Sequence, residues 1–387
     1  MEDRQTYEIK DICLGIYEGP HATPKVAKTG GIYLGIPALT STGHINYDNI
    51  RYISDEDMPI WTKRVTPQEG DIVFTNEATL NLYAVIPPHF YGCLGRRLGL
   101  IRPNKDLVDV NYLFYYFFSP EWRETISKNK VSGATVERIL MTKFPHFPIS
   151  LPSLSTQQKI SKILSTIDAK IENNRKINDN LEQQAEALYK SWFVDFEPFK
   201  DQEFVESEFG LIPEGWQCTT LSELLSIKYG KDHKKLAEGT IPVYGSGGLM
   251  RYVDTKLHEG EAVLIPRKGT LNNVMYVNEA FWTVDTMFYS IPKQENSCIY
   301  AYLFLANKDL ASMNAGSAVP SMTTDILNNM LIIAPPAEVL RQFNNICNVY
   351  FSRINQNNIE NANLSNQRDT LLPKLMSGEL KVNEIDC

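Results

Sequence analysis

The sequence has no long apolar run: no stretch of its 387 residues approaches the about 20 apolar residues that a membrane-spanning helix needs. Its first residues, MEDRQTYEIK, include acids and lack the apolar core of a secretory leader. These two absences exclude the usual sequence signals of a membrane or exported protein. We therefore expect a cytoplasmic protein with no membrane partner.

Paired metal ligands are also missing. None of the six cysteines forms a CxxC pair, so neither a zinc site nor a disulfide framework is predicted. The six histidines form no close pair, and HExxH, Walker and strand-following GxGxxG motifs are absent. The GSGG stretch at residues 245–248 lacks the Lys-Ser/Thr of a phosphate loop and is expected to form a tight turn. The sequence predicts no metal-binding and no catalytic residue.

The sequence also has fewer basic than acidic residues. The formal net charge is -8, which argues against a protein that holds nucleic acid by bulk charge alone. A local basic face can still lie within an acidic total, so charge by itself does not decide the class of partner. What the chain does have is 43% hydrophobic residues, enough at this length for two or more cores.

The most informative feature that is present is an internal repeat. Adding 183 to a position in the first half carries Phe144 to Leu327 and Pro152 to Pro335, with no gap between them. Upstream, with a different shift, EGDIVF at residues 69–74 answers EGEAVL, which begins at Glu259. The chain is therefore predicted to hold two copies of one unit, each a globular part followed by a long helix.

The globular parts are predicted to be mixed and rich in strands. GDIVFTN, YAVIP, AVLIPRK and VMYVN are short runs of β-branched and aromatic residues, which favour strands. NYLFYYFFSPEWRETISKN and IYAYLFLANKDLASMN place apolar residues near a helical period. We predict an α+β fold in four segments: a first globular domain (1–151), a first long spacer helix (152–200), a second globular domain (201–335) and a second long spacer helix (336–387).

Two segments repeat apolar residues at alternating steps of three and four, which is typical of a coiled-coil seam. Each seam also contains two asparagines at the same place in the pattern. The predicted seam positions are Ile160, Leu164, Ile171, Asn174, Asn178, Leu181, Leu188 and Trp192 in the first helix, and Phe343, Ile354, Asn357, Asn361, Leu364 and Leu371 in the second.

The simplest packing of two tandem copies is about a pseudo-two-fold axis, which makes the two long helices antiparallel. Asn178 then faces Asn357, and Asn174 faces Asn361. A slip in register would bury an unpaired amide at a cost of roughly 1 to 3 kcal/mol, so the amides are predicted to fix the register. The alternative is that both pairs lie at the solvated edge of the seam.

The length of the helices suggests a spacer. A helix of about 40 residues is about 60 Å long, which is the length of about 18 base pairs of duplex DNA. Only Ile167 opposite Arg368 interrupts the apolar run of the predicted seam. Two similar domains held apart by such a spacer suit a long, repetitive ligand, and duplex DNA is the obvious one.

Several segments, taken together in their order and spacing, are specific. They are PSLSTQQKISKILSTIDAKIENN with LYKSWFVDFEPF in the first long helix, GLIPEGWQCTTLSEL (210–224), IPVYGSGG (241–248), VLIPRKGTLNNVMYV (263–277) and LLPKLMSGEL (371–380). Through them the chain resembles the specificity subunit of type I restriction-modification enzymes over essentially its whole length. The resemblance implies two target-recognition domains that read a split, asymmetric sequence in double-stranded DNA. It also implies helical spacers that set the gap and dock two methyltransferase subunits and, through them, restriction/translocase subunits.

The resemblance further implies that catalysis resides in other polypeptides. In this family the partner subunits carry S-adenosylmethionine, ATP and Mg²⁺, and the specificity subunit binds no cofactor. In agreement, the chain lacks the Asn-Pro-Pro-aromatic motif and the glycine-rich cofactor loop of an amino-methyltransferase. Two alternatives stay open: an adaptor whose helix pair assembles proteins without DNA, and a nuclease or methyltransferase with cryptic catalytic residues.

DNA contacts would come from basic and amide side chains on loops, because Arg reads guanine, Asn reads adenine, and Lys and Arg bind phosphate. The candidates in the first domain are Lys63, Arg64, Asn76, Asn81, Arg96 and Arg97, and those in the second are Lys231, Lys234, Lys235, Arg267, Lys268, Asn272 and Asn273. The loop FTNEATLNL departs from the basic or Ser-Gly version that is usual in the family. Which residues of the first domain contact bases is therefore open, and a solvated surface is the alternative for each candidate.

Overall fold

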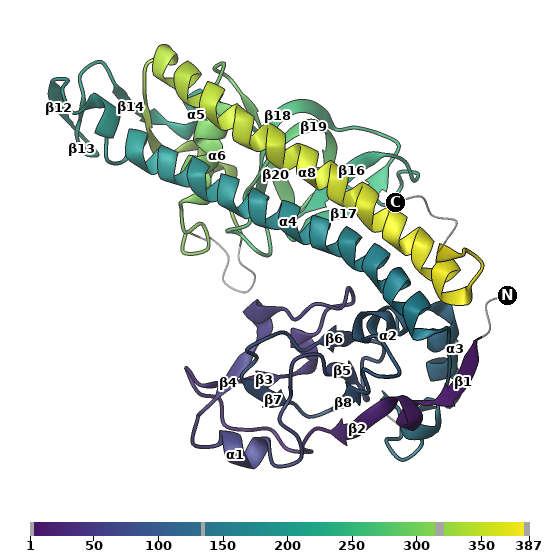
Figure 1. Ribbon diagram of the computed structural model, residues 1–387. Coiled ribbons are helices and arrows are strands. Elements are labelled where there is room, and N and C mark those ends of the chain that lie inside the picture. Colours follow the sequence, from purple (N-terminus) through teal and green to yellow (C-terminus); the bar gives the residue numbers. More distant parts are fainter. Residues whose placement is uncertain (1–3, 133–135, 314–320, 383–387) are drawn as a thin grey trace. The chain divides into compact units, whose positions relative to one another are not determined.

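Figure 1 presents the computed structural model, which describes residues 4–132, 136–313 and 321–382. Its contacts group into two compact units. Unit 1 comprises residues 1–173 and 360–387, and unit 2 comprises residues 174–359. Each unit holds one globular domain and a stretch of each long helix. The contacts thus divide the chain inside both helices, and the predicted domain boundaries stay a prediction.

Unit 1 is built on a four-stranded sheet in the order β2-β8-β5-β6, a three-stranded sheet in the order β4-β3-β7, and the pairs β1-β11 and β9-β10. The strands are β1 (Gln5–Glu8), β2 (Cys13–Glu18), β3 (Gly31–Leu34), β4 (Arg51–Ile53), β5 (Ile72–Thr75), β6 (Tyr83–Val85), β7 (Gly92–Leu94), β8 (Leu98–Pro103), β9 (Val131–Ser132), β10 (Glu137–Arg138) and β11 (Pro148–Leu151). The strands predicted from GDIVFTN and YAVIP are confirmed as β5 and β6.

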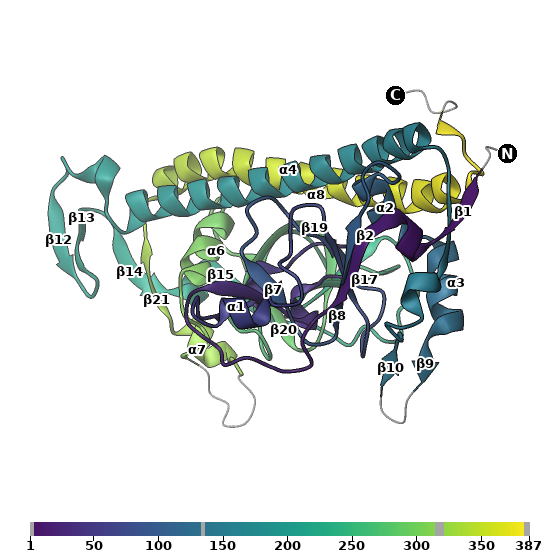
Figure 2. The same ribbon diagram turned by 60° about the horizontal axis from the view of Figure 1, so that its bottom comes forward.

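The helices of unit 1 are α1 (Met58–Trp61), α2 (Val110–Tyr116) and α3 (Pro120–Asn129), and Figure 2 shows α3 beside β9 and β10. The helical run predicted for residues 111–129 is divided in two. The side chain of Ser119 accepts the backbone N–H of Trp122 and caps the start of α3. Pro120 follows at the first helical position, where it cannot donate the hydrogen bond that would continue α2.

Unit 2 contains a six-stranded sheet in the order β15-β20-β18-β19-β16-β17, the hairpin β12-β13 and the pair β14-β21. The strands are β12 (Phe204–Ser207), β13 (Gly210–Pro213), β14 (Gln217–Thr220), β15 (Leu225–Tyr229), β16 (Ile241–Gly245), β17 (Gly248–Val253), β18 (His258–Pro266), β19 (Met275–Thr283), β20 (Met287–Pro292) and β21 (Leu331–Ala334). The runs AVLIPRK and VMYVN are confirmed as strands β18 and β19. The GSGG stretch forms the predicted tight turn between β16 and β17.

The shorter helices of unit 2 are α5 (Leu221–Leu224), α6 (Cys298–Ala306) and α7 (Thr324–Asn328). The helical run predicted from residue 299 onward is shorter than its sequence pattern suggests. The side-chain amide of Asn307 donates to the carbonyl of Leu303 and so satisfies an acceptor at the end of α6. The residues that follow, up to Met313, form turns.

The two long helices are α4 (Leu154–Phe193), of 40 residues, and α8 (Ala337–Ser377), of 41 residues. They lie side by side and antiparallel within each unit (Figure 1), as the α+β prediction with an antiparallel helix pair requires. In unit 2, the ring of Trp192 packs 5.8 Å from that of Phe343. In unit 1, Leu164 and Leu371 pack in one apolar core.

The asparagine layer of unit 2 is buried. Asn357 donates its side-chain amide to Asn178 Oδ1 at 2.7 Å, which is the pairing that the seam pattern predicts. Asn178 in turn donates to Asn358 Oδ1 at 2.9 Å. With Asn357 1% and Asn178 7% exposed, this pair does not lie at a solvated edge of the seam. The pairing of Asn174 with Asn361 would join the two units and stays a prediction.

The remaining seam positions are accounted for within their own units. In unit 2, Leu181, Leu188, Trp192, Phe343 and Ile354 belong to or pack against one core cluster. In unit 1, Ile160, Leu164 and Leu371 do the same, while Ile171 is buried and Leu364 is half-buried.

Arg368, which interrupts the predicted seam, has a partner that the seam pattern does not contain. Its guanidinium Nη1 lies 2.8 Å from Asp168 Oδ1, and the hydroxyl of Tyr115 donates to Asp168 Oδ2 at 2.6 Å. The two charged side chains are only 16% and 20% exposed. The interruption is therefore a partly buried ionic layer between the helix pair and α2.

Candidate nucleic-acid interface

The candidate loops of both units are held by equivalent backbone bonds. The loop after β5 is held by Ile139, whose N–H donates to the carbonyl of Asn76 at 2.8 Å. The loop after β18 is held by Met322, whose N–H donates to the carbonyl of Arg267 at 2.9 Å. Isolated bridges beside these bonds join Glu77 to Arg138 and Lys268 to Ser321. Sequence divergence has therefore changed the side chains of this loop while its anchorage is the same.

In unit 1, Asn76 is buried. Its side chain is only 4% exposed, and its amide donates to Glu18 Oε1 at 3.1 Å. A contact of Asn76 with DNA stays a prediction, and the side chain ties the loop to the end of β2. The sequence could not show this, since Glu18 is distant along the chain.

Two arginines of unit 1 are also engaged within the domain. Arg97 Nε lies 3.0 Å from Glu77 Oε1, and the two side chains are each about one-third exposed. Arg64 donates from Nη1 to the carbonyl of Gly19 at 3.2 Å. Because an ion pair near the surface is weak, a phosphate could replace Glu77 as the partner of Arg97 at little cost.

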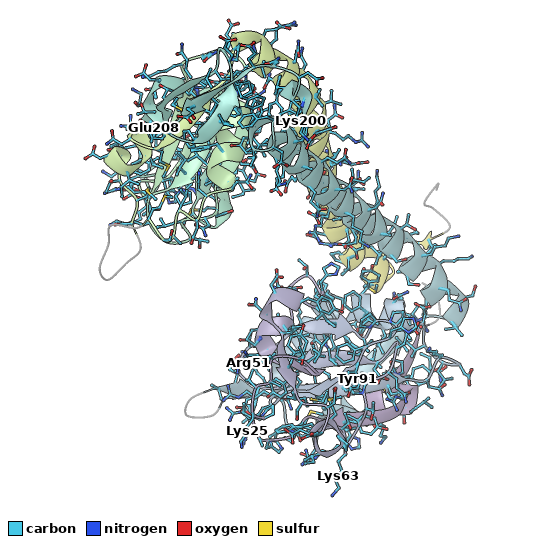
Figure 3. The ribbon with its side chains drawn as sticks, turned by 90° about the vertical axis from the view of Figure 1, so that its left-hand side faces the viewer. Lys25, Arg51, Lys63, Tyr91, Lys200 and Glu208 are labelled. Atoms are coloured by element: carbon cyan, nitrogen blue, oxygen red, sulfur yellow. The ribbon has the colours of Figure 1, made fainter. Side chains whose placement is uncertain are left out.

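The other candidates of unit 1 lie at the surface. Lys63 and Arg96 are exposed, and Lys63 extends from the surface of the domain in Figure 3. Asn81 is half-buried and accepts a hydrogen bond from the hydroxyl of Tyr83 at 3.2 Å. Lys63, Arg64 and Arg96 are therefore the exposed cations among the predicted residues of unit 1.

The loop after β5 is strained where its counterpart is not. Ala78 has a φ of 70° and Asn81 a φ of 64°, in the left-handed region that residues other than glycine seldom adopt. The position that matches Ala78 in unit 2 is Gly269, with a φ of 87°. Strain of this kind persists only where the surrounding structure enforces it, and it is frequent in binding loops.

In unit 2, Arg267 is stacked on an aromatic ring. Its guanidinium carbon lies 5.5 Å from the ring centre of Tyr229, and Nη1 donates to the carbonyl of Asp285 at 3.1 Å. Tyr229 is 53% exposed and packs edge-on against Phe288. A stacked guanidinium is held flat and keeps donors for a planar acceptor pair such as the N7 and O6 atoms of guanine.

The two asparagines of this loop serve mainly to shape it. Asn272 donates its amide to Asp309 Oδ1 at 3.1 Å and accepts the N–H of Ala311 at 2.8 Å. The bond from Asn272 is the main cause of a lowered pKa of Asp309. Asn273 donates to the carbonyl of Ser246 at 2.8 Å. Both amides therefore hold neighbouring segments, and Lys268 adds an exposed ammonium to this loop.

A second group of cations lies in the loop after β15. The backbone of Lys231 is anchored twice: its N–H donates to Thr283 and its carbonyl accepts from Trp282 Nε1, each at 2.9 Å. The N–H of Lys234 bonds Asp232, which keeps the pKa of this carboxyl low. Lys231, Lys234 and Lys235 are all exposed. The loop is thus fixed at its base and presents lysines to solvent, as phosphate binding requires.

Two residues near these loops were not singled out from the sequence. Tyr229 is the platform for Arg267, and Arg138 is exposed beside the loop after β5 through its bridge to Glu77. The internal repeat could have pointed to Arg138. Adding 183 leads to Ser321, whose backbone forms a bridge with Lys268 as that of Arg138 does with Glu77.

Neither a metal site nor a membrane span is found in the described part of the chain. Within residues 4–132, 136–313 and 321–382, no three His, Cys, Asp or Glu side chains gather as they would around a metal ion. In these same ranges, none of the helices combines the length and the apolar character needed to cross a bilayer.

The family model for the type I restriction modification DNA specificity domain matches residues 1–183 and 213–366. The chain belongs to this family. The specificity-domain chain is 29% identical to the type I restriction enzyme MjaIX specificity subunit of Methanocaldococcus jannaschii, over 90% of this chain and 88% of the relative. It is 26% identical to the HindI specificity subunit of Haemophilus influenzae, over 73% of this chain and 80% of the relative.

A solved structure shares the fold. The crystal structure of the type I restriction-modification S subunit from M. genitalium matches with a TM-score of 0.62 at 17% identity, covering 97% of this chain and 96% of that one. The predicted fold class of the specificity-domain chain is thereby confirmed.

Proposed function

We propose that this specificity-domain chain reads a split, asymmetric sequence in duplex DNA, with one part read by each unit. The observation that carries the proposal is the pair of loops after β5 and β18: their backbone anchorage is equivalent and their side chains differ. A conserved frame with different side chains suits two half-sites that differ in sequence. The recognition elements would read base edges in the major groove, while exposed lysines bind phosphates.

The chemistry belongs to partners in this proposal. Two methyltransferase subunits with S-adenosylmethionine would each act on an adenine flipped out of the duplex, one in each half-site. Restriction/translocase subunits would supply ATP- and Mg²⁺-dependent steps. The chain itself is non-catalytic and supplies the sequence specificity. The complex acts on DNA in the cytoplasm.

The first experiment changes one half-site only. The double variant Arg267→Ala/Lys268→Ala removes the stacked guanidinium and the neighbouring ammonium of unit 2. In the assembled methyltransferase complex it should weaken binding to the target by about 10-fold or more and relax the sequence preference in one half-site alone, because a bidentate arginine contributes about 1 to 3 kcal/mol of discrimination. Binding is measured with a library of duplexes.

A control variant, Lys256→Ala, removes an exposed lysine just before the opposite end of β18 and should leave both half-sites unchanged. Relaxed preference in both half-sites after the double substitution, or in neither, would show that unit 2 does not read its own part of the target.

The second experiment tests the spacer. Inserting one heptad after Ile171 and one after Asn361, which are opposite points in the predicted pairing, lengthens both long helices while preserving the seam pattern and its asparagine pairs. The gap between the half-sites should grow by about three base pairs, since seven residues add about 10 Å, and the half-sites should stay the same. A gap of unaltered length would rule out a spacer function for the helix pair.

A further inference from the structure

Unit 2 has an apolar cavity that the proposed DNA interface does not use. The cavity has a volume of about 180 Å³ and lies where the end of α4 meets α6 and the segment before β13. Most of its lining is aromatic: Tyr189, Phe193, Phe196, Phe209, Tyr300 and Phe304. Lys308 also lines it, with its ammonium 4.8 Å from the ring centre of Phe304. Figure 2 shows the hairpin β12-β13 projecting from this end of the unit.

Large apolar side chains are exposed around this cavity. Val194 and Phe209, which line it, are 55% and 42% exposed. Leu211, on the same hairpin, is 61% exposed. Single exposed apolar residues are ordinary, but a group of them beside an aromatic cavity is typical of a surface that binds a protein.

The rim, meaning the hairpin and its flanks beside the cavity, is acidic. Five exposed carboxylates lie on and beside the hairpin, whose turn contributes Phe209 to the cavity lining. They are Asp201, Glu203, Glu206, Glu208 and Glu214. Of the nearby lysines, Lys190 and Lys200 are paired with Asp195 and Glu197, and Lys308 lies over the ring of Phe304 within the cavity. The rim is therefore negative, which repels a phosphate backbone and attracts a basic partner.

We propose that this hairpin surface docks a basic segment of a protein partner. One apolar side chain of the segment enters the aromatic cavity, and lysines or arginines on either side of it pair with the carboxylates of the rim. Buried aromatic contacts of this kind supply most of the binding energy of an interface, while the rim charges speed the encounter and select the partner. This inference rests on the proposed function, under which the partner is a methyltransferase subunit.

The test compares charge reversal at the hairpin with charge reversal elsewhere in the same unit. Glu206→Lys/Glu208→Lys changes the rim, Phe209→Ala opens the cavity, and Glu238→Lys/Glu295→Lys is the control at two exposed acids outside the hairpin. The full-length chain is titrated with its methyltransferase subunit at low and high salt. Circular dichroism and thermal unfolding establish that each variant is folded.

The hairpin charge reversal should raise the Kd for the methyltransferase subunit by about 10-fold or more at low salt and by less at high salt, because screening weakens the contact in the wild type. Phe209→Ala should raise the Kd by about 10-fold at both salt concentrations, and the control by less than about 2-fold. DNA specificity of complexes assembled at saturating subunit concentrations should be unchanged.

Hairpin variants that bind the subunit as tightly as the wild type overturn the docking proposal. So does a charge reversal that strengthens DNA binding and leaves the Kd for the subunit unchanged, because the surface would then face DNA. Failure of the wild-type chain itself to bind the subunit, or to direct methylation, contradicts the proposed function instead. The two failures are thus distinguishable.

Discussion

The main sheets of the two units follow one plan, and one interruption distinguishes them. In unit 2, β16 pairs antiparallel with β17 and parallel with β19, and in unit 1, β3 pairs antiparallel with β4 and parallel with β7. The continuous β19 thus corresponds to β6 and β7 together. Pro87 and Pro88 stand between β6 and β7, where they cannot donate to a sheet. The scaffold is repeated, while the connections have diverged.

A second difference concerns the contact of the helix pair with the domain. In unit 1, Asp168 binds both Arg368 and Tyr115. Adding 183 to Asp168 leads to Phe351 in unit 2, whose ring packs 5.7 Å from that of Tyr302. At this position of the repeat, unit 1 joins the helix pair to the domain by an ion pair and a hydrogen bond, whereas unit 2 joins them by aromatic packing. The comparison predicts different sensitivities of the two units.

The largest effect is expected from the ionic layer. Arg368→Ala leaves Asp168 partly buried without its main cation and should lower the free energy of unfolding of unit 1 by about 3 kcal/mol. Tyr115→Phe should cost about 1.5 kcal/mol, because it removes a hydrogen bond to a charged group. The matched Tyr302→Phe in unit 2 should cost less than about 0.5 kcal/mol. Urea unfolding checks all three, and equal costs for the two tyrosine variants would refute the difference between the units.

An intermediate effect is expected from the asparagine layer. Asn178→Ala leaves the buried amide of Asn357 without its acceptor and should cost about 1 to 3 kcal/mol. The double variant Asn178→Leu/Asn357→Leu should be more stable than the wild type in thermal unfolding, and it should show mixed register or self-association in gel filtration. A double variant that is merely less stable would show that the layer does not act as a seam.

The smallest effect separates the strained loop after β5 from its unstrained counterpart after β18. Gly269→Ala places a side chain at a φ of 87° and brings its Cβ within 2.8 Å of Ser246 Oγ, so it should cost about 1 to 2 kcal/mol. Ala78→Gly relieves strain but adds entropy to the unfolded chain, and the net change should stay within about 0.5 kcal/mol. Thermal unfolding measures both, and equal losses of stability in the two variants would contradict the difference in strain between the loops.

The repeat and the antiparallel helix pair could be predicted from the sequence, because the spacing of apolar residues and asparagines indicates which positions of the two helices face one another. The partner of Arg368 could not. Asp168 lies next to Ile167, outside the seam, and only the placement of α2 brings Tyr115 to it.

The candidate site was predictable by location more than by residue. The loops after β5 and β18 follow from the aligned strands, and Arg267 lies there as expected. That Asn76 turns inward to Glu18, while Asn272 holds Asp309, depends on tertiary neighbours that no local pattern contains. Amide side chains are ambiguous in this respect, because they satisfy buried backbone and side-chain groups as readily as they bind base edges.

The most direct test of the central claim is a map of methylated adenines in the DNA of cells with and without this chain, in the presence of its methyltransferase partner. The account predicts that one split, asymmetric motif is methylated only when the chain is present. Identical maps, with the methyltransferase demonstrably present and active, would show that the chain does not direct methylation and would favour a protein adaptor without a DNA target.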